Sequence, residues 1–81
     1  MREKWNYTHE GEQIEVINNW FMGEKLKING RVVDEQSSFF SATLTGKLKD
    51  KTNVRAVIKA NFITVNCSLY IDDTLVDIKK A

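Results

Sequence analysis

The chain has 81 residues, of which 42% are hydrophobic and 28% charged, with twelve basic and eleven acidic side chains. This length predicts one small domain over residues 1–81, and the composition is that of a folded protein rather than a disordered one. A net charge of +1 disfavours nucleic acid as the partner, because a dedicated nucleic-acid-binding domain usually carries a large basic excess. No apolar stretch is long enough to span a bilayer, and the N-terminal segment lacks the apolar part of a signal peptide. We therefore expect a cytoplasmic protein without membrane attachment.

Cys67 is the single cysteine of the chain. One cysteine excludes an intrachain disulfide and a zinc site built from several cysteines. A domain of this size hides a modest fraction of its surface on folding, so its stability must come from a well-packed core or from association with another chain.

Short segments in which apolar and polar residues alternate follow one another along the chain. In chain order they predict strands around Trp5 and Tyr7, around Ile14 and Val16, and at 26–28, 31–33, 40–48, 54–61, 63–71 and 74–76. A two-residue period is typical of strands with one buried and one exposed face. The fourteen valine and isoleucine residues also favour strands, because branching at Cβ suits a pleated surface. No segment shows a sustained helical spacing of apolar residues.

Turn residues separate these strands. Two-residue turns are predicted at Glu10 and Gly11, at Asn29 and Gly30, and at Asp72 and Asp73. Asn-Gly is the strongest of these signals, because a type I′ turn needs a positive φ angle at both central residues. A polar connection is expected at 34–38 and a four-residue turn at 50–53.

These elements predict an all-β fold, an antiparallel meander of about seven or eight strands. Such a meander buries one face by forming a small β-sandwich or, as the alternative, a closed or partly open barrel. The residues expected in the core are Trp5, Tyr7, Ile14, Val16, Leu26, Ile28, Val33, Phe40, Leu44, Ile58, Val65, Leu69, Ile71 and Val76.

Two segments of the chain are similar to each other. LKINGRVVD at 26–34 and LYIDDTLVD at 69–77 both place a turn after an apolar-polar-apolar triplet and end on an aspartate. Either a duplicated unit or the general likeness of alternating hairpins explains this similarity.

The order of motifs also resembles a known family. A tryptophan strand, Gly-x-x-Ile-Glu-Val at 11–16, Leu-Thr-Gly-Lys at 44–47 and Leu-Tyr-Ile-Asp-Asp at 69–73 follow one another as in the Fas apoptotic inhibitory molecule family. This resemblance implies a compact β-sandwich without known catalytic activity that acts through protein contacts. The chain lacks the family's Asp-Gly turns and has Phe39 and Phe40 in place of its tryptophan-methionine-phenylalanine stretch, so only the fold is carried over.

The residues that bear chemistry do not form a catalytic pattern. His9 is expected as an exposed turn residue, because a general base needs a partner and a substrate pocket. Cys67 falls on the apolar side of its strand, where a buried and inert thiol is expected. The acidic residues lack the spacing of a calcium loop and are expected to be solvated; they are Glu10, Glu12, Glu15, Asp72, Asp73 and Asp77. We therefore expect no enzyme activity, no metal and no cofactor.

A group of basic residues would line the exposed face of one hairpin: Lys47, Lys49, Lys51, Arg55 and Lys59. Such a face binds single-stranded nucleic acid when aromatic stacking platforms accompany it, and this is the alternative function. Lysines on outer strands also discourage edge-to-edge aggregation without any ligand, and this is the interpretation that we favour.

Aromatic residues are in surplus at two places. Trp20, Phe21 and Met22 are consecutive, as are Phe39 and Phe40, so a strand cannot bury all of them on one face. They form either an interaction surface around Trp20, Phe21 and Phe39 or a bulge that turns them inward. We expect a non-enzymatic protein-interaction or assembly module whose partner is an unknown protein or a second copy of the chain.

Overall fold

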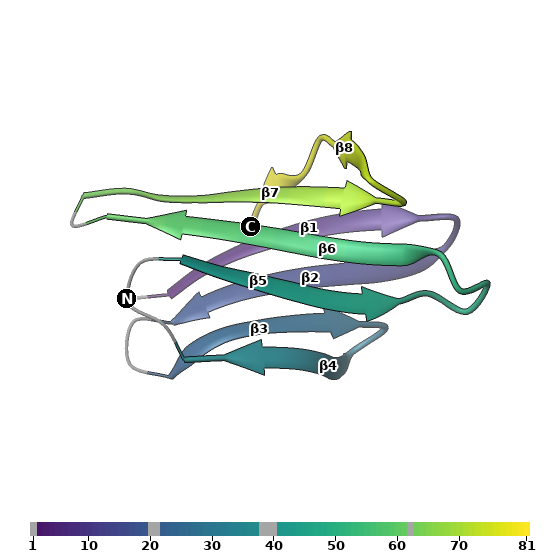
Figure 1. Ribbon diagram of the computed structural model, residues 1–81, viewed down its shortest axis with the longest axis horizontal. Coiled ribbons are helices and arrows are strands. Elements are labelled where there is room, and N and C mark those ends of the chain that lie inside the picture. Colours follow the sequence, from purple (N-terminus) through teal and green to yellow (C-terminus); the bar gives the residue numbers. More distant parts are fainter. Residues whose placement is uncertain (1, 20–21, 38–40, 62) are drawn as a thin grey trace.

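The computed structural model describes residues 2–19, 22–37, 41–61 and 63–81, which form nine strands (Figure 1). In chain order the strands are β1 (Arg2–His9), β2 (Glu12–Asn19), β3 (Gly23–Ile28), β4 (Arg31–Gln36), β5 (Ser41–Lys47), β6 (Asn53–Ala60), β7 (Val65–Ile71), β8 (Thr74–Val76) and β9 (Lys79–Lys80). None of the described segments is a helix long and apolar enough to cross a bilayer.

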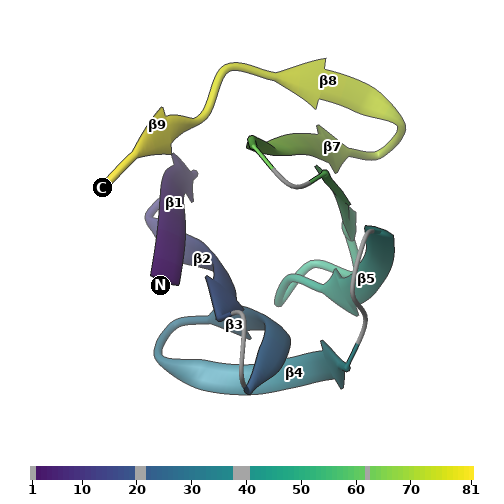
Figure 2. The same ribbon diagram turned by 90° about the vertical axis from the view of Figure 1, so that its left-hand side faces the viewer.

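The strands form two antiparallel sheets that pack face to face. The first sheet has the order β4-β3-β2-β1-β9 and the second has the order β5-β6-β7-β8. Figure 2, seen along the strands, shows the two sheets on opposite sides of a shared interior. The predicted all-β sandwich is confirmed, and the described strands do not join into one closed ring.

Two-residue turns connect the hairpins where the sequence predicts them. Their central residues have positive φ angles, for example 52° at Asn29 and 82° at Gly30. The side chain of Asn29 also stabilises its turn, because its Oδ1 accepts a hydrogen bond of 2.9 Å from the main-chain N–H of Gln13. These turns fix the register of the neighbouring strands.

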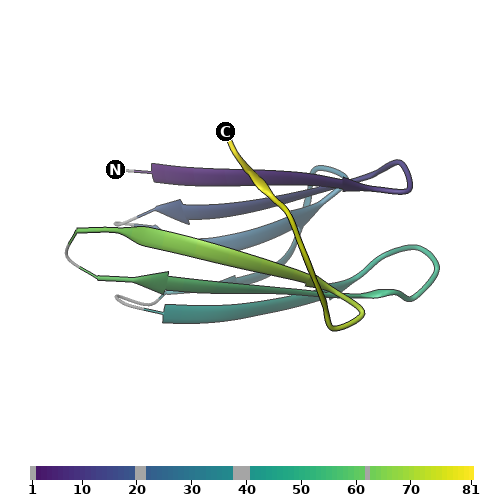
Figure 3. The same cartoon turned by 90° about the horizontal axis from the view of Figure 1, so that it is seen from above.

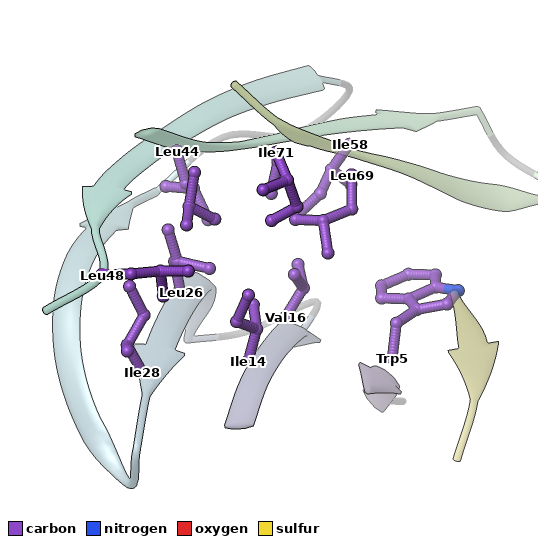
Figure 4. Packing of buried hydrophobic residues seen from close by; sticks show 12 residues of the cluster. Trp5, Ile14, Val16, Leu26, Ile28, Leu44, Leu48, Ile58, Leu69 and Ile71 are labelled. Atoms are coloured by element: carbon purple, nitrogen blue, oxygen red, sulfur yellow. The ribbon is translucent and has the colours of Figure 1, made fainter. Parts of the chain in front are cut away.

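The core lies between the sheets and consists of the inward-facing residues of both (Figure 4). Nine of the predicted core residues are buried: Trp5, Ile14, Val16, Leu26, Ile28, Leu44, Ile58, Leu69 and Ile71. Four are partly buried against them: Tyr7, Val33, Val65 and Val76. The remaining one, Phe40, lies outside the described residues. Trp5 lies at the margin of the cluster, beside β9 (Figure 4).

Three expectations about the strands need correction. The segment 34–36 belongs to β4 rather than to a connection, and β9 was not predicted. Ile63 was expected in a strand but is 90% exposed. The side-chain oxygen of Asn61 accepts hydrogen bonds of 2.8 Å from the N–H groups of Ile63 and Thr64, and this local turn delays the start of β7 to Val65.

One lateral side of the sandwich, which we call the closed side, is bridged between β4 and β5. Asp34 Oδ2 accepts a hydrogen bond of 2.9 Å from the main-chain N–H of Thr45. The side-chain amide of Gln36 donates one of 2.7 Å to the main-chain oxygen of Thr43. Side chains of β4 thus occupy main-chain groups along the edge of β5, which explains why β4 extends to Gln36.

The two similar segments of the sequence occupy matching places in the fold. LKINGRVVD forms the β3–β4 hairpin and LYIDDTLVD forms the β7–β8 hairpin, which are the third and fourth strands within their halves of the chain. Each hairpin also ends a sheet, because β4 and β8 are edge strands. The matching positions make the hairpins directly comparable.

Candidate functional site

The aromatic residues predicted as an interaction surface, Trp20, Phe21 and Phe39, lie outside the described residues. Their neighbour Met22 is described and is 69% exposed. Ile63, which is 90% exposed, lies in the β6–β7 connection at the same end of the sandwich (Figure 1). The predicted aromatic surface itself stays a prediction.

The five basic residues do not form one continuous face. Lys47, Arg55 and Lys59 lie on the outer face of β5 and β6, whereas Lys49 and Lys51 lie in the connection beyond the strands. Lys47 Nζ donates a hydrogen bond of 2.7 Å to the side-chain oxygen of Asn53. These cations are therefore dispersed over the length of the hairpin.

Acidic and aromatic groups accompany the same cations. The guanidinium of Arg55 lies 4.5 Å from the ring centre of Tyr70, and its Nη2 is 3.7 Å from a carboxylate oxygen of Asp73. Asp50 lies in the connection between Lys49 and Lys51, and the hydrogen bond from the Thr52 side chain is the largest cause that lowers its pKa. A phosphate backbone along this hairpin would meet carboxylates as well as cations, which weakens the nucleic-acid alternative.

Several other acidic residues and His9 have partners close by. Lys4 Nζ lies 2.7 Å from Glu15, and His9 Nε2 lies 3.4 Å from Glu10 in the adjoining turn. The carboxylate of Glu12 accepts a hydrogen bond of 3.2 Å from the side chain of Asn29. Among the described residues, no three His, Cys, Asp or Glu side chains are grouped so that they could hold a metal ion.

Cys67 points into the sandwich from β7 and packs against the core cluster. Burial raises the pKa of its thiol to about 12, because the thiolate would lose hydration. The thiol therefore stays protonated at neutral pH and is a poor nucleophile. It is partly buried, whereas the sequence predicts a buried thiol.

The second lateral side of the sandwich, which we call the open side, lies between β7–β8 and β1–β9 (Figure 2). β8 is short and pairs only with the last three residues of β7, from Leu69 to Ile71. Residues 65–68 of β7 are paired with β6, but no described strand pairs with them on the opposite side. We call the main-chain groups of residues 65–68 that point away from β6 the β7 edge.

The hairpin geometry shows which groups the β7 edge offers. Residues of an antiparallel strand turn their N–H and C=O groups alternately toward one neighbour and the other. The two-residue turn makes Ile71 and Thr74 a hydrogen-bonded pair, so the odd-numbered residues of β7 face the β8 side. Val65 and Cys67 therefore direct their N–H and C=O groups to the open side.

Hydrogen bonds on the other side of β7 agree with this assignment. The N–H of Asp72 donates to the main-chain oxygen of Asn53 at 2.9 Å, and the N–H of Asn61 donates to that of Thr64 at 2.9 Å. These bonds place the even-numbered residues of β7 in the ladder with β6. The odd-numbered residues 65 and 67 are then left for a partner on the open side.

A cavity of about 430 Å³ lies beside the β7 edge. Its walls come from Trp5 of β1, residues 65–68 of β7, residues 75–78 and Lys80 of β9. Leu75 is 62% exposed at this cavity, whereas Trp5 is 6% exposed and reaches it from the core. This lining places the β7 edge, β8 and β1 around one depression.

β1 borders the open side from the first sheet and also carries main-chain groups that face it. β9 pairs with Trp5 and Asn6, and the N–H of Ala81 donates to the main-chain oxygen of Lys4 at 2.7 Å. This bond shows that the even-numbered residues of β1 face the open side. The main-chain groups of Arg2 face the same side, and no described strand pairs with them there.

The open side was not identified from the sequence, although one signal was present. Only three residues, Thr74 to Val76, follow the turn before Asp77, whereas β7 has seven. A hairpin with arms of such unequal length leaves part of the longer arm uncovered. The same comparison in the first half of the chain gives two arms of six residues, β3 and β4.

The fold and this site define the chain as a small β-sandwich with one closed and one open side. Comparison with protein-family models, with curated proteins and with solved structures finds no match to it. The resemblance to the Fas apoptotic inhibitory molecule family stays a prediction.

Proposed function

We propose that the chain is a non-enzymatic protein-interaction module and that the open side is its contact surface. One observation carries this proposal: an uncovered strand edge, a cavity of about 430 Å³ and the 62% exposed Leu75 occur together. Uncovered strand edges and exposed apolar side chains are features that other polypeptide chains bind. The thiol of Cys67 at this site stays protonated at neutral pH, because burial raises its pKa to about 12.

Site-specific photo-crosslinking in cells that express the protein tests this proposal. A photoreactive phenylalanine analogue replaces Leu75 on β8 in one variant and Val32 on β4 in the control variant. Both residues are exposed on edge strands, 62% for Leu75 and 41% for Val32, but only Leu75 borders the cavity. We expect protein adducts from position 75 and few from position 32. Equal labelling at both positions, or none at position 75, would contradict the proposed surface.

The nucleic-acid alternative is tested separately with a labelled single-stranded oligonucleotide at low ionic strength. Binding through the basic residues predicts an affinity that falls steeply as salt rises. Because Asp50 and Asp73 lie among these cations, we expect no such binding. Tight, salt-sensitive binding that is lost in Lys47→Glu would favour the alternative.

A further inference from the structure

We propose that the open side binds one extended segment of a partner protein, which adds a strand to the β7 edge and runs antiparallel to β7 and β1. The inference rests on the function proposed above and names the form of the partner. Val65 and Cys67 offer two N–H and two C=O groups in the spacing of a strand ladder. Only an extended chain with the same repeat satisfies all of them at once.

The comparison of the two similar hairpins indicates that a strand segment is what this place lacks. In the first sheet, β4 pairs with β3 from Glu24 to Ile28, so the hairpin is covered along nearly its whole length. In the second sheet, β8 covers Leu69 to Ile71 and leaves residues 65–68 of β7 open. An added segment of about four residues would complete the second hairpin as the first is completed by its own chain.

The direction of the segment follows from the strands that border it. The arrowheads of β1 and β7 point the same way in Figure 1, so a single strand can be antiparallel to both. In Figure 3 the C-terminal segment crosses over the open side and ends beside β1. The bond from the N–H of Ala81 to the main-chain oxygen of Lys4 shows that β1 offers main-chain groups to a strand on this side.

The side chains around the site predict the sequence pattern of the segment. Residues that face inward would meet Trp5, Val65 and Cys67, which are apolar and belong to or pack against the core. The cavity wall also carries Asp77 and Lys80, so outward-facing residues of the segment would meet charged groups of both signs. Apolar residues should therefore alternate with polar ones.

The geometry favours a single strand over a second copy of the chain. β1 and β9 bound the cavity opposite the β7 edge. If β7 of a second copy paired with this edge, its own β6 would come to the place that β1 and β9 occupy. One strand fits between these borders, whereas the edge of a second sheet does not.

The probe for the test is a phage-displayed library of random peptides of about nine residues, a length that suffices for one strand. We expect enrichment of peptides in which apolar and polar residues alternate. Amide hydrogen exchange then locates the bound peptide: the amides of Val65 and Cys67 should exchange about tenfold more slowly, as expected for newly formed ladder bonds. The amide of Thr45, which Asp34 already holds on the closed side, should not change.

Two variants supply matched controls. Leu75→Asp places a charge at the cavity and should weaken the selected peptides about tenfold or more, whereas Val32→Asp on the other edge strand should not. Val65→Pro removes an N–H that faces the open side and leaves the β6 ladder intact, so a loss of about fivefold is expected. The exchange measurement on the unmodified protein stands even if one variant fails to fold.

Several outcomes would overturn the inference. No enrichment, or peptides that bind without protecting Val65 and Cys67, would remove the strand-addition mode. If sedimentation shows dimers and the same two amides become protected as the protein alone is concentrated, the occupant is a second copy. In each case, protein crosslinks from position 75 would leave the proposed function in place, and their absence would remove it as well.

Discussion

Replacing Gly23 with alanine tests the packing at the end of the first sheet. Gly23 has a φ angle of 92°, and a Cβ atom there would overlap the main-chain oxygen of Gln36 and lie 3.1 Å from the Cα of Ser37. Gly11 is the matched control, because its φ angle is 80° but a Cβ atom would meet nothing within 4 Å. Both substitutions cost about 1–2 kcal/mol in backbone conformation. Gly23→Ala adds an overlap with main chain that cannot move aside, worth about 1–3 kcal/mol more.

Urea unfolding measures this difference, with the fluorescence of the buried Trp5 as the signal. A domain of this length has a free energy of unfolding of about 4–12 kcal/mol, so Gly23→Ala should remove a large part of it and Gly11→Ala much less. Equal dependence on urea concentration in both variants would show that the denatured states are comparable. If Gly11→Ala lowers the free energy of unfolding as much as Gly23→Ala does, the reasoning is refuted, because the overlap with the Gln36 main-chain oxygen would then add no destabilisation.

Three further predictions concern Cys67, Asp34 and Leu44. The pKa of Cys67 is raised to about 12 in the folded protein, so its thiol stays neutral while the unfolded chain ionises above about pH 9. The free energy of unfolding should therefore fall as the pH rises above 9, by at most about 1.4 kcal/mol at pH 10 relative to the Cys67→Ala variant. A difference between the two proteins that does not change with pH would contradict this prediction. The Asp34 carboxylate accepts a hydrogen bond from the N–H of Thr45, so Asp34→Ala should lower the free energy of unfolding by about 1 kcal/mol and speed amide exchange at Thr45. Unchanged exchange at Thr45 would show that this bond does not protect the amide. Leu44→Ala, at a residue with 0% exposure, should lower the free energy of unfolding by about 2–5 kcal/mol, and a calorimetric loss below 1 kcal/mol would place Leu44 outside the core.

Alternation of apolar and polar residues was sufficient to predict the fold class and most of the core. Leu26, Leu44 and Ile58 are buried as expected, because each belongs to a run in which every second residue is apolar. The turns were predictable for a separate reason: a positive φ angle is needed at both of their central residues, and Asn29 and Gly30 tolerate it. Local sequence therefore carries both the strand faces and the turn positions.

Features that depend on distant partners were not predictable. β9 consists of Lys79 and Lys80, which have no alternating pattern and form a strand because β1 pairs with them. Asn18 and Glu24 are only 6% and 2% exposed, although both are polar, because the register places them opposite each other on the inward face. Ile63 is exposed because the Asn61 side chain forms a turn before β7. For β9, Asn18 and Glu24 the partner lies on another strand, whereas the turn at Asn61 is a local feature that the alternating pattern of apolar residues does not reveal.

The open side illustrates why the hydrophobic pattern alone does not locate an uncovered strand edge. Both halves of the chain alternate in the same way through their first three strands, and both place similar hairpins at the third and fourth. They differ in the length of the fourth strand, six residues in β4 and three in β8. Inward-facing side chains are buried in both halves of the chain. The third strand, in contrast, is paired along nearly its whole length only in the first half, where the fourth strand is long. Because strand edges bind other strands through main-chain groups that every residue possesses, the shorter fourth strand leaves uncovered the edge at which we propose that a partner adds, and it does so without changing the composition of the core.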